Sequence, residues 1–86
     1  MYDVVWTDHA YDDLADVWVA AQSETRDRIE TALRKLTAEL NDDPDEVGES
    51  RDGLRRIAVR PPLVVVFRVE SVARTVRVNH VWRYGK

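Results

Sequence analysis

The stretch that decides the fold is LRRIAVRPPLVVVFRVESVARTVRVNHVW, residues 54–82. It holds three apolar-rich runs, which are Leu54 to Arg60, Leu63 to Val69 and Thr75 to Trp82. Alternating apolar and polar side chains are typical of β-strands, and the Pro61-Pro62 pair and residues 70–74 are short enough for tight turns. Strands joined this closely pair antiparallel, so the stretch predicts a three-stranded meander. The middle run is apolar at successive positions and is therefore expected to be the central strand.

The residues before this stretch predict one strand and two helices. Alternation from Tyr2 to Trp6 indicates a short strand. Thr7 is a candidate N-cap for a first helix, and Ser23 is a candidate N-cap for a second. The apolar stripes are Tyr11, Leu14, Ala15 and Trp18 in the first helix and Ile29, Ala32, Leu33, Leu36 and Leu40 in the second. Residues 42–52, DDPDEVGESRD, are mostly acidic and are expected to form a mobile loop.

The predicted fold class is therefore α+β. A short N-terminal strand and a helical hairpin precede a three-stranded antiparallel meander, which forms one sheet packed on the helices. A chain of 86 residues has room for one compact core, so residues 1–86 are expected to form a single domain.

Composition restricts the compartment and the partners. The chain has no cysteine, which excludes disulfides, thiolate metal sites and a cysteine nucleophile and suits the reducing cytoplasm. Its longest apolar run, Leu63 to Phe67, is far too short to cross a bilayer, so no membrane partner is expected. The net charge is −3, yet residues 1–50 carry 14 acidic and 4 basic side chains, whereas residues 51–86 carry 9 basic and 2 acidic ones. Because charges act locally at physiological salt, the C-terminal part can still bind phosphate.

The predicted strands sort their side chains onto two faces, because successive residues on a strand point in opposite directions. The face expected under the helices collects Ile57, Val59, Leu63, Val65, Phe67, Val69, Val76, Val78, His80 and Trp82. The opposite face collects Arg56, Ala58, Arg60, Val64, Val66, Arg68, Arg77, Asn79, Val81 and Arg83. Guanidinium groups bind phosphate oxygens in bidentate geometry, so this second set is a candidate phosphate-binding surface. Alternatively, the arginines only solvate the sheet and prevent pairing at its edges.

The two histidines have different expected surroundings. Strict alternation places His80 on the apolar face, which favours a buried or edge side chain, although a twist or bulge near the strand end would leave it available for acid chemistry. His9 lies near the start of the first helix, and the chain has no second histidine at metal-ligand spacing. We therefore expect neither a metal site nor a cofactor.

Four segments, in their order along the chain, resemble the RelE/ParE superfamily of toxins from bacterial type II toxin-antitoxin systems. They are VVWTDHAYDDLADVW at the start, GLRRIAV after the acidic loop, PPLVVVFRV, and the closing VRVNHVWRY. The resemblance covers nearly the whole chain. It implies a small α+β toxin that a cognate antitoxin holds inactive by wrapping over it.

The resemblance leaves three activities open. RelE-like members cut mRNA on the ribosome without a metal and so inhibit translation, whereas ParE-like members poison DNA gyrase. A catalytically degenerate relative would only bind its antitoxin. The expected partners besides the antitoxin are therefore the ribosome and mRNA in the first case and DNA gyrase in the second. The leading prediction is the ribosome-associated endoribonuclease.

For that leading prediction, the resemblance implies a base for the ribose 2′-hydroxyl, an acid for the leaving oxygen, and arginines that stabilise charge on the phosphate. The candidate catalytic residues are Arg56, Arg60, His80, Arg83 and Tyr84, with Glu46 or Glu49 as the base, and the candidate substrate-binding residues are Arg68, Arg77 and Asn79. Two departures count against a nuclease. The second meander strand of nuclease members often begins with an arginine, where this chain has Pro62, Leu63 and Val64, and ribosome-dependent members are strongly basic, whereas this chain is acidic.

Overall fold

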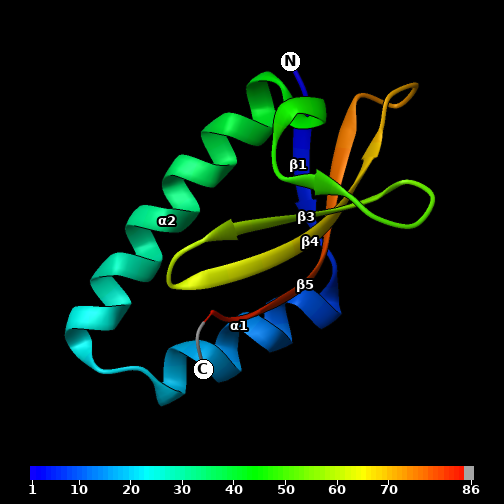
Figure 1. Ribbon diagram of the computed structural model, residues 1–86. Helices are drawn as coiled ribbons and strands as arrows, with labels where there is room; N and C mark the ends of the chain where they lie inside the picture. The colour runs from blue at the N-terminus through cyan, green and yellow to red at the C-terminus, as the bar shows by residue number, and fades with distance from the viewer. Residues whose placement is uncertain (85–86) are drawn as a thin grey trace.

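The computed structural model describes residues 1–84 of the chain, and its elements follow the predicted order (Figure 1). They are β1 (Asp3–Trp6), α1 (Asp8–Ala20), α2 (Ser23–Asp42), the short 3-10 helix η1 (Pro44–Glu46), β2 (Glu49–Ser50), β3 (Arg55–Arg60), β4 (Leu63–Glu70) and β5 (Thr75–Arg83). The predicted α+β fold, with a helical hairpin between a short strand and a meander, is confirmed. Within the described residues, no helix is both long enough and apolar enough to cross a membrane.

The strands form one mixed sheet in the order β1-β5-β4-β3-β2. β3, β4 and β5 make the predicted antiparallel meander, with β4 at its centre. β1 adds a parallel edge beside β5, and β2 adds a short antiparallel edge beside β3. The sheet therefore has five strands, because the two short edge strands join the three expected ones.

Capping residues and apolar periodicity in the sequence explain where α1 begins and which face of α2 is buried. Thr7 caps α1 as predicted, since its side-chain oxygen accepts a 3.1 Å hydrogen bond from the Ala10 N–H. Ser23 is not the cap of α2, because the helix already begins at Ser23 and Gln22 precedes it without a side-chain cap. The buried face of α2 carries Ile29, Ala32, Leu36 and Leu40, as the periodicity predicts. Ile29, Leu36 and Leu40 pack with Phe67, Val65, Val76 and Val78 of the sheet in one core.

The mobile loop predicted at residues 42–52 is wrong. Most of this segment is structured as the end of α2, the η1 turn and β2. Pro44 and Val47 are buried, and the guanidinium of Arg56 donates to the carbonyls of Val47 and Gly48. Although the segment is mostly acidic, its two buried apolar residues and the short strand β2 hold it against the edge of β3.

The predicted faces of β3 are reversed. The Pro61-Pro62 turn pairs Arg60 with Leu63 directly, and paired residues share a face of the sheet. Arg56, Ala58 and Arg60 therefore lie on the side covered by the helices, and Ile57 and Val59 lie on the other side. Counting the alternation across the turn as if the strands were continuous produces this error, because one residue of offset exchanges the faces.

A bulge reverses the faces of β5 at its C-terminal half. Phe67 pairs with Val78 and Val66 pairs with His80, so Asn79 is an extra residue with no partner position on β4. Beyond it, Val81 is buried in the core, whereas His80 and Trp82 lie on the other face, where both are exposed. The predicted positions of His80, Val81, Trp82 and Arg83 relative to the two faces are therefore wrong.

We call the two sides of the sheet the helix side and the second face. The helix side carries Arg56, Ala58, Arg60, Leu63, Val65, Phe67, Val69, Val76, Val78, Val81 and Arg83. The second face carries Arg55, Ile57, Val59, Val64, Val66, Arg68, Arg77, His80 and Trp82.

Candidate functional site

A cleft of about 670 Å³ opens on the second face near the junction of β1 and α1. Its lining comes from the turn before α1, the 52–55 segment, β4 and the bulge of β5: Thr7, His9, Asp52, Gly53, Leu54, Arg55, Arg68, Asn79 and His80. The bulge at Asn79 creates this wall, because it turns both Asn79 and His80 toward the cleft.

A row of three arginines crosses the meander beside the cleft. Arg55 pairs with Arg68 across β3 and β4, and Arg68 pairs with Arg77 across β4 and β5. Arg55 donates a 3.0 Å hydrogen bond to Asp52, and Arg77 donates two, of 3.1 and 3.3 Å, to Glu70. The hydrogen bonds from Arg77 hold the pKa of the Glu70 carboxyl below its ordinary value. Arg55 and Arg68 are the members of the row that line the cleft.

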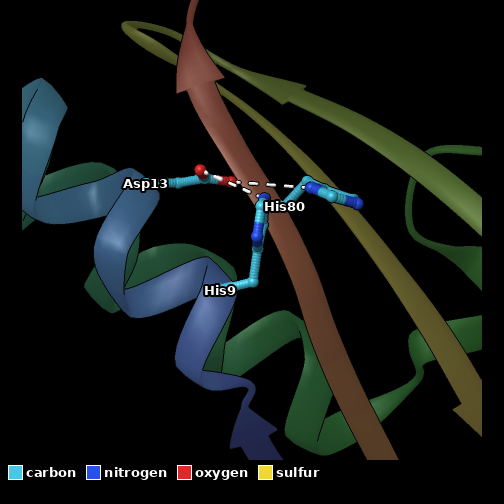
Figure 2. A group of neighbouring side chains, drawn as sticks. All are labelled: His9, Asp13 and His80. Atoms are coloured by element: carbon cyan, nitrogen blue, oxygen red, sulfur yellow. Dashed lines mark ion pairs between the residues drawn. The ribbon is translucent and has the colours of Figure 1, made fainter.

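The most compact polar group at the cleft is formed by His9, Asp13 and His80, which we call the His-Asp-His cluster (Figure 2). The Asp13 carboxylate reaches from α1 toward β5, with Oδ1 3.4 Å from His9 Nε2 and Oδ2 3.6 Å from His80 Nδ1. The two imidazole rings meet edge to face, with centroids 4.6 Å apart. The Val81 N–H donates a 3.1 Å hydrogen bond to Asp13 Oδ2 and so fixes the carboxylate against β5.

Three of the predicted site residues come together in this cleft, namely Arg68, Asn79 and His80. Arg77 lies next to Arg68 in the arginine row. The basic surface that the sequence predicts is therefore present only in part. Arg55 takes the position beside Arg68 that strict alternation assigns to Arg56.

The other predicted arginines lie elsewhere, so the convergence predicted for Arg56, Arg60 and Arg83 is wrong. Arg56 donates to the carbonyls of Val47 at 2.9 Å and Gly48 at 3.1 Å on the helix side. Arg60 donates to Glu39 of α2 at 3.0 Å and to its neighbouring carbonyl at Val59. Arg83 pairs with Leu63 at the far end of β5 and is exposed.

The remaining candidates also lie away from the cleft. Tyr84 follows β5, where its N–H donates to the Pro62 carbonyl at 2.8 Å and its side chain is exposed. Glu46 is exposed in η1, and Glu49 is exposed in β2, where it lies 3.7 Å from Arg51. None of these three residues lines the cleft.

The cleft and the His-Asp-His cluster also contain residues that sequence reasoning missed. Identifying Arg55 as a site residue requires the correct register of the β3–β4 hairpin. The sequence could have given that register, because the residues on either side of a two-residue turn pair directly. His9 and Asp13 are four residues apart in a predicted helix, a spacing that places two side chains on one face. The approach of His80 to them depends on the bulge and on tertiary packing, so the sequence offers no comparable signal for it.

A second hollow, of about 410 Å³, lies between the two helices on the outside of the domain. It is lined by Tyr11, Leu14, Ala15, Trp18, Val19, Glu30 and Leu33. Tyr11 and Val19 are largely exposed there, at 58% and 76%. The predicted helical hairpin thus presents an apolar groove to solvent.

Comparisons with known proteins identify the family. The family model described as the ParE toxin of the type II toxin-antitoxin system, parDE, matches residues 4–83. The fold is similar to a structure of the chromosomal ParDE system from P. aeruginosa, with a TM-score of 0.72, 19% identity and 96% of each chain covered. It is also similar to the RelBE2 toxin-antitoxin complex from Mycobacterium tuberculosis, with a TM-score of 0.73, 23% identity, and 95% of this chain and 96% of that chain covered.

The isolated E. coli RelE toxin matches with a TM-score of 0.67 and 18% identity over 100% of this chain and 87% of that one. No curated protein sequence matches this chain. At these identities the structural matches establish the fold alone, whereas the family model covers nearly the whole chain. The chain therefore belongs to the ParE toxin family of type II toxin-antitoxin systems.

Proposed function

We propose that this toxin inhibits DNA gyrase, as ParE-like members of the superfamily do, and that a cognate antitoxin neutralises it. The observation that carries the choice of gyrase over mRNA is the dispersal of the arginines on which an RNA-cutting site would depend. Arg56 and Arg60 are engaged on the helix side, and Arg83 lies at the far end of β5.

Dispersal matters because cleavage of a phosphodiester requires several groups to act on one phosphate. The acid, the base and the charge-stabilising arginines must all lie within hydrogen-bond reach of the same reacting atoms. Arg56 would have to release two backbone carbonyls to take part, and Arg60 would have to leave Glu39. Inhibition of a protein target needs no such convergence, since a surface of suitable shape is sufficient.

The groove between α1 and α2 supports the antitoxin part of the proposal. It is predominantly apolar, and its lining residues Trp18 and Leu33 continue into the core. Such a groove suits an amphipathic helix that inserts apolar side chains at helical spacing. Replacing Leu33 by Asp would place a charge in the groove and should abolish antitoxin binding, which can be measured by titration calorimetry with the cognate antitoxin.

The target is tested by adding the purified toxin to two reactions in parallel. In the first, gyrase acts on plasmid DNA, and we expect loss of supercoiling and accumulation of cleaved DNA. In the second, ribosomes translate a reporter mRNA, and we expect full-length mRNA and normal product. A toxin that spares gyrase while it cuts mRNA would overturn the proposal, and inactivity in both reactions would favour a relative that only binds antitoxin.

RNA cleavage within the cleft is the second candidate, because Arg68, Asn79 and His80 line it together with His9 and Arg55. This version uses a histidine acid and two arginines, without Arg56, Arg60 or Arg83. Its test compares Arg68→Ala and His80→Gln with the control Arg51→Ala, which removes the same charge from an exposed position outside the cleft. A cleft nuclease would lose mRNA cleavage in the first two variants and keep it in the control.

The same variants sharpen the gyrase proposal. If gyrase is the target and the cleft is not involved, Arg68→Ala, His80→Gln and Arg51→Ala should all inhibit supercoiling as the unmodified toxin does. A loss confined to the two cleft variants would place the gyrase contact at the cleft and leave the target unchanged.

A further inference from the structure

We propose that His9, Asp13 and His80 form a binding site for a divalent transition-metal ion of the zinc type. The three side chains come from two elements that are far apart in the sequence, α1 and β5, and their potential ligand atoms all lie within 4.8 Å of one another (Figure 2). Within residues 1–84 no other cluster of this kind occurs.

The spacing of the ligand atoms fits such an ion. Zinc ligands at ~2.0–2.1 Å from the metal lie roughly 3.3 Å apart around a tetrahedral ion. The two imidazole nitrogens lie 3.4 and 3.6 Å from the nearest Asp13 oxygens. Both imidazoles are partly exposed, with side chains at 64% for His9 and 47% for His80, so a small rotation can bring them to ligand distance without disturbing the core.

The chemistry of the three side chains also suits this class of ion. Two imidazoles and one carboxylate are ligands that zinc, cobalt and nickel accept, whereas magnesium and calcium prefer oxygen alone. Asp13 is already oriented by the 3.1 Å hydrogen bond from the Val81 N–H, which is the kind of outer contact that positions a ligating carboxylate. His9 and Asp13, at a spacing of four residues on α1, present their ligand atoms from one face of a single helix.

Ion pairing within the cluster without a metal is the competing explanation, and the metal titrations below distinguish the two. At 3.6 Å, the distance from His80 Nδ1 to Asp13 Oδ2 exceeds that of a hydrogen bond. In Figure 2 each carboxylate oxygen of Asp13 faces one imidazole nitrogen, Oδ1 toward His9 and Oδ2 toward His80. The three residues thus bring ligand atoms of the right kind within 4.8 Å of one another.

Three protein ligands leave one position of a tetrahedral ion for water or an anion. His9 and His80 also line the cleft, so that position has access to solvent. Arg55 and Arg68 line the same cleft and would favour an anionic fourth ligand there.

The site can be tested by titrating the untagged, metal-free toxin with Zn²⁺ in a calorimeter, and separately with Co²⁺, whose visible absorption reports tetrahedral coordination. We expect one ion per chain. His9→Gln, His80→Gln and Asp13→Asn should each weaken binding by about tenfold or more. Asp12→Asn is the matched control, because it removes a neighbouring exposed carboxylate of α1 that is not part of the cluster, and it should bind as the unmodified chain does.

Three results would overturn the proposal: no saturable Zn²⁺ binding, equal binding of Mg²⁺, or unchanged binding in all three cluster variants. Thermal unfolding supplies a second measurement, since at one Zn²⁺ concentration the melting temperature should rise more for the unmodified chain and Asp12→Asn than for His80→Gln. Neither measurement involves gyrase or mRNA, so the metal site and the proposed function can fail independently.

Discussion

Arg55 and Arg56 are adjacent in β3, yet they enter two regions of the molecule whose polar groups are arranged differently. On the helix side, Arg56 donates to two backbone carbonyls of the 44–50 segment. On the second face, Arg55 lines an open cleft and contacts Asp52, whose side chain is 92% exposed. One region uses its arginine to hold the chain together, and the other keeps its arginine where solvent and a partner can reach it.

This difference reduces the number of arginines in the C-terminal half that remain available to bind an anion. Alternation along the predicted strands places five arginines on a single surface. In the structure, Arg56 and Arg60 lie instead on the helix side, where they form hydrogen bonds with other parts of the chain. The surface left for an anion is the shorter row of Arg55, Arg68 and Arg77, in which Arg55 is paired with the exposed Asp52 and Arg77 with Glu70. Substitutions matched across the two regions test this division.

The largest contrast is expected between apolar residues of the two regions. Phe67 is completely buried on the helix side, whereas Val59 on the second face is 43% exposed. Phe67→Ala should lower the free energy of unfolding by about 3–5 kcal/mol, because it leaves a cavity in the core. Val59→Ala should change it by about 0.5 kcal/mol or less. Urea unfolding followed by tryptophan fluorescence measures both values, and similar losses would mean that the second face is as tightly packed as the core.

Two glycines extend the comparison to the backbone. Gly48 on the helix-side segment and Gly53 at the cleft both have positive φ, of 67° and 55°. An added Cβ at Gly48 would collide with the backbone carbonyl of Ile57, whereas at Gly53 it would meet nothing within 4 Å. Gly48→Ala should therefore cost about 2–3 kcal/mol through combined strain and overlap, and Gly53→Ala about 1 kcal/mol through backbone strain alone.

The glycine pair is measured by the same unfolding experiment. Equal losses in the two variants would show that the 44–50 segment moves away from β3 easily. That result would contradict the structured segment described above and restore the loop that the sequence predicts.

The arginine pair itself should give a smaller difference. Arg56→Ala removes two hydrogen bonds to backbone carbonyls and should cost about 1–2 kcal/mol. Arg55→Ala removes an exposed pair with Asp52 and should cost less than about 1 kcal/mol. If Arg55→Ala proved the more destabilising of the two variants, Arg55 rather than Arg56 would be the arginine that stabilises the fold.

The sequence predicted the elements better than their faces, and the reason is physical. Helices and strands follow from periodicities of a few residues, so β4, α2 and the Thr7 cap could be read directly. The face on which a side chain lies depends on the pairing register of its strand. The register is set by the turn at Pro61-Pro62 and by the extra residue Asn79, and a change of one residue at either place exchanges the two faces.

The site was less predictable because its parts meet only through tertiary packing. Arg68, Asn79 and His80 were identified as candidates, and all three line the cleft. His9 joins them in the cleft, and Asp13 approaches His80, because α1 packs along β5, which no local pattern in either segment encodes.

The smallest effect concerns the outer end of the arginine row. Hydrogen bonds from Arg77, together with the charges of Arg77 and Arg68, lower the pKa of Glu70 from its ordinary value of 4.5. A carboxyl whose pKa is lower in the folded state than in the unfolded state contributes stability above the unfolded pKa and loses it as the pH falls through the folded pKa. The contribution of Glu70 should therefore be complete at pH 7 and disappear on acidification below about pH 4.5.

Arg77→Gln should raise the Glu70 pKa toward its ordinary value, which a carboxyl ¹³C NMR titration measures. Arg83→Gln is the matched control, because it removes an exposed arginine from the same strand on the other side of the sheet. The unfolding free energies of Arg77→Gln and the unmodified chain should differ slightly at pH 7 and converge as the pH falls through the folded-state pKa of Glu70, since protonation removes the pairing. An unchanged Glu70 pKa in Arg77→Gln would mean that the ion pair does not persist in solution, and Arg77 would then join Arg55 and Arg68 as an arginine available to a partner.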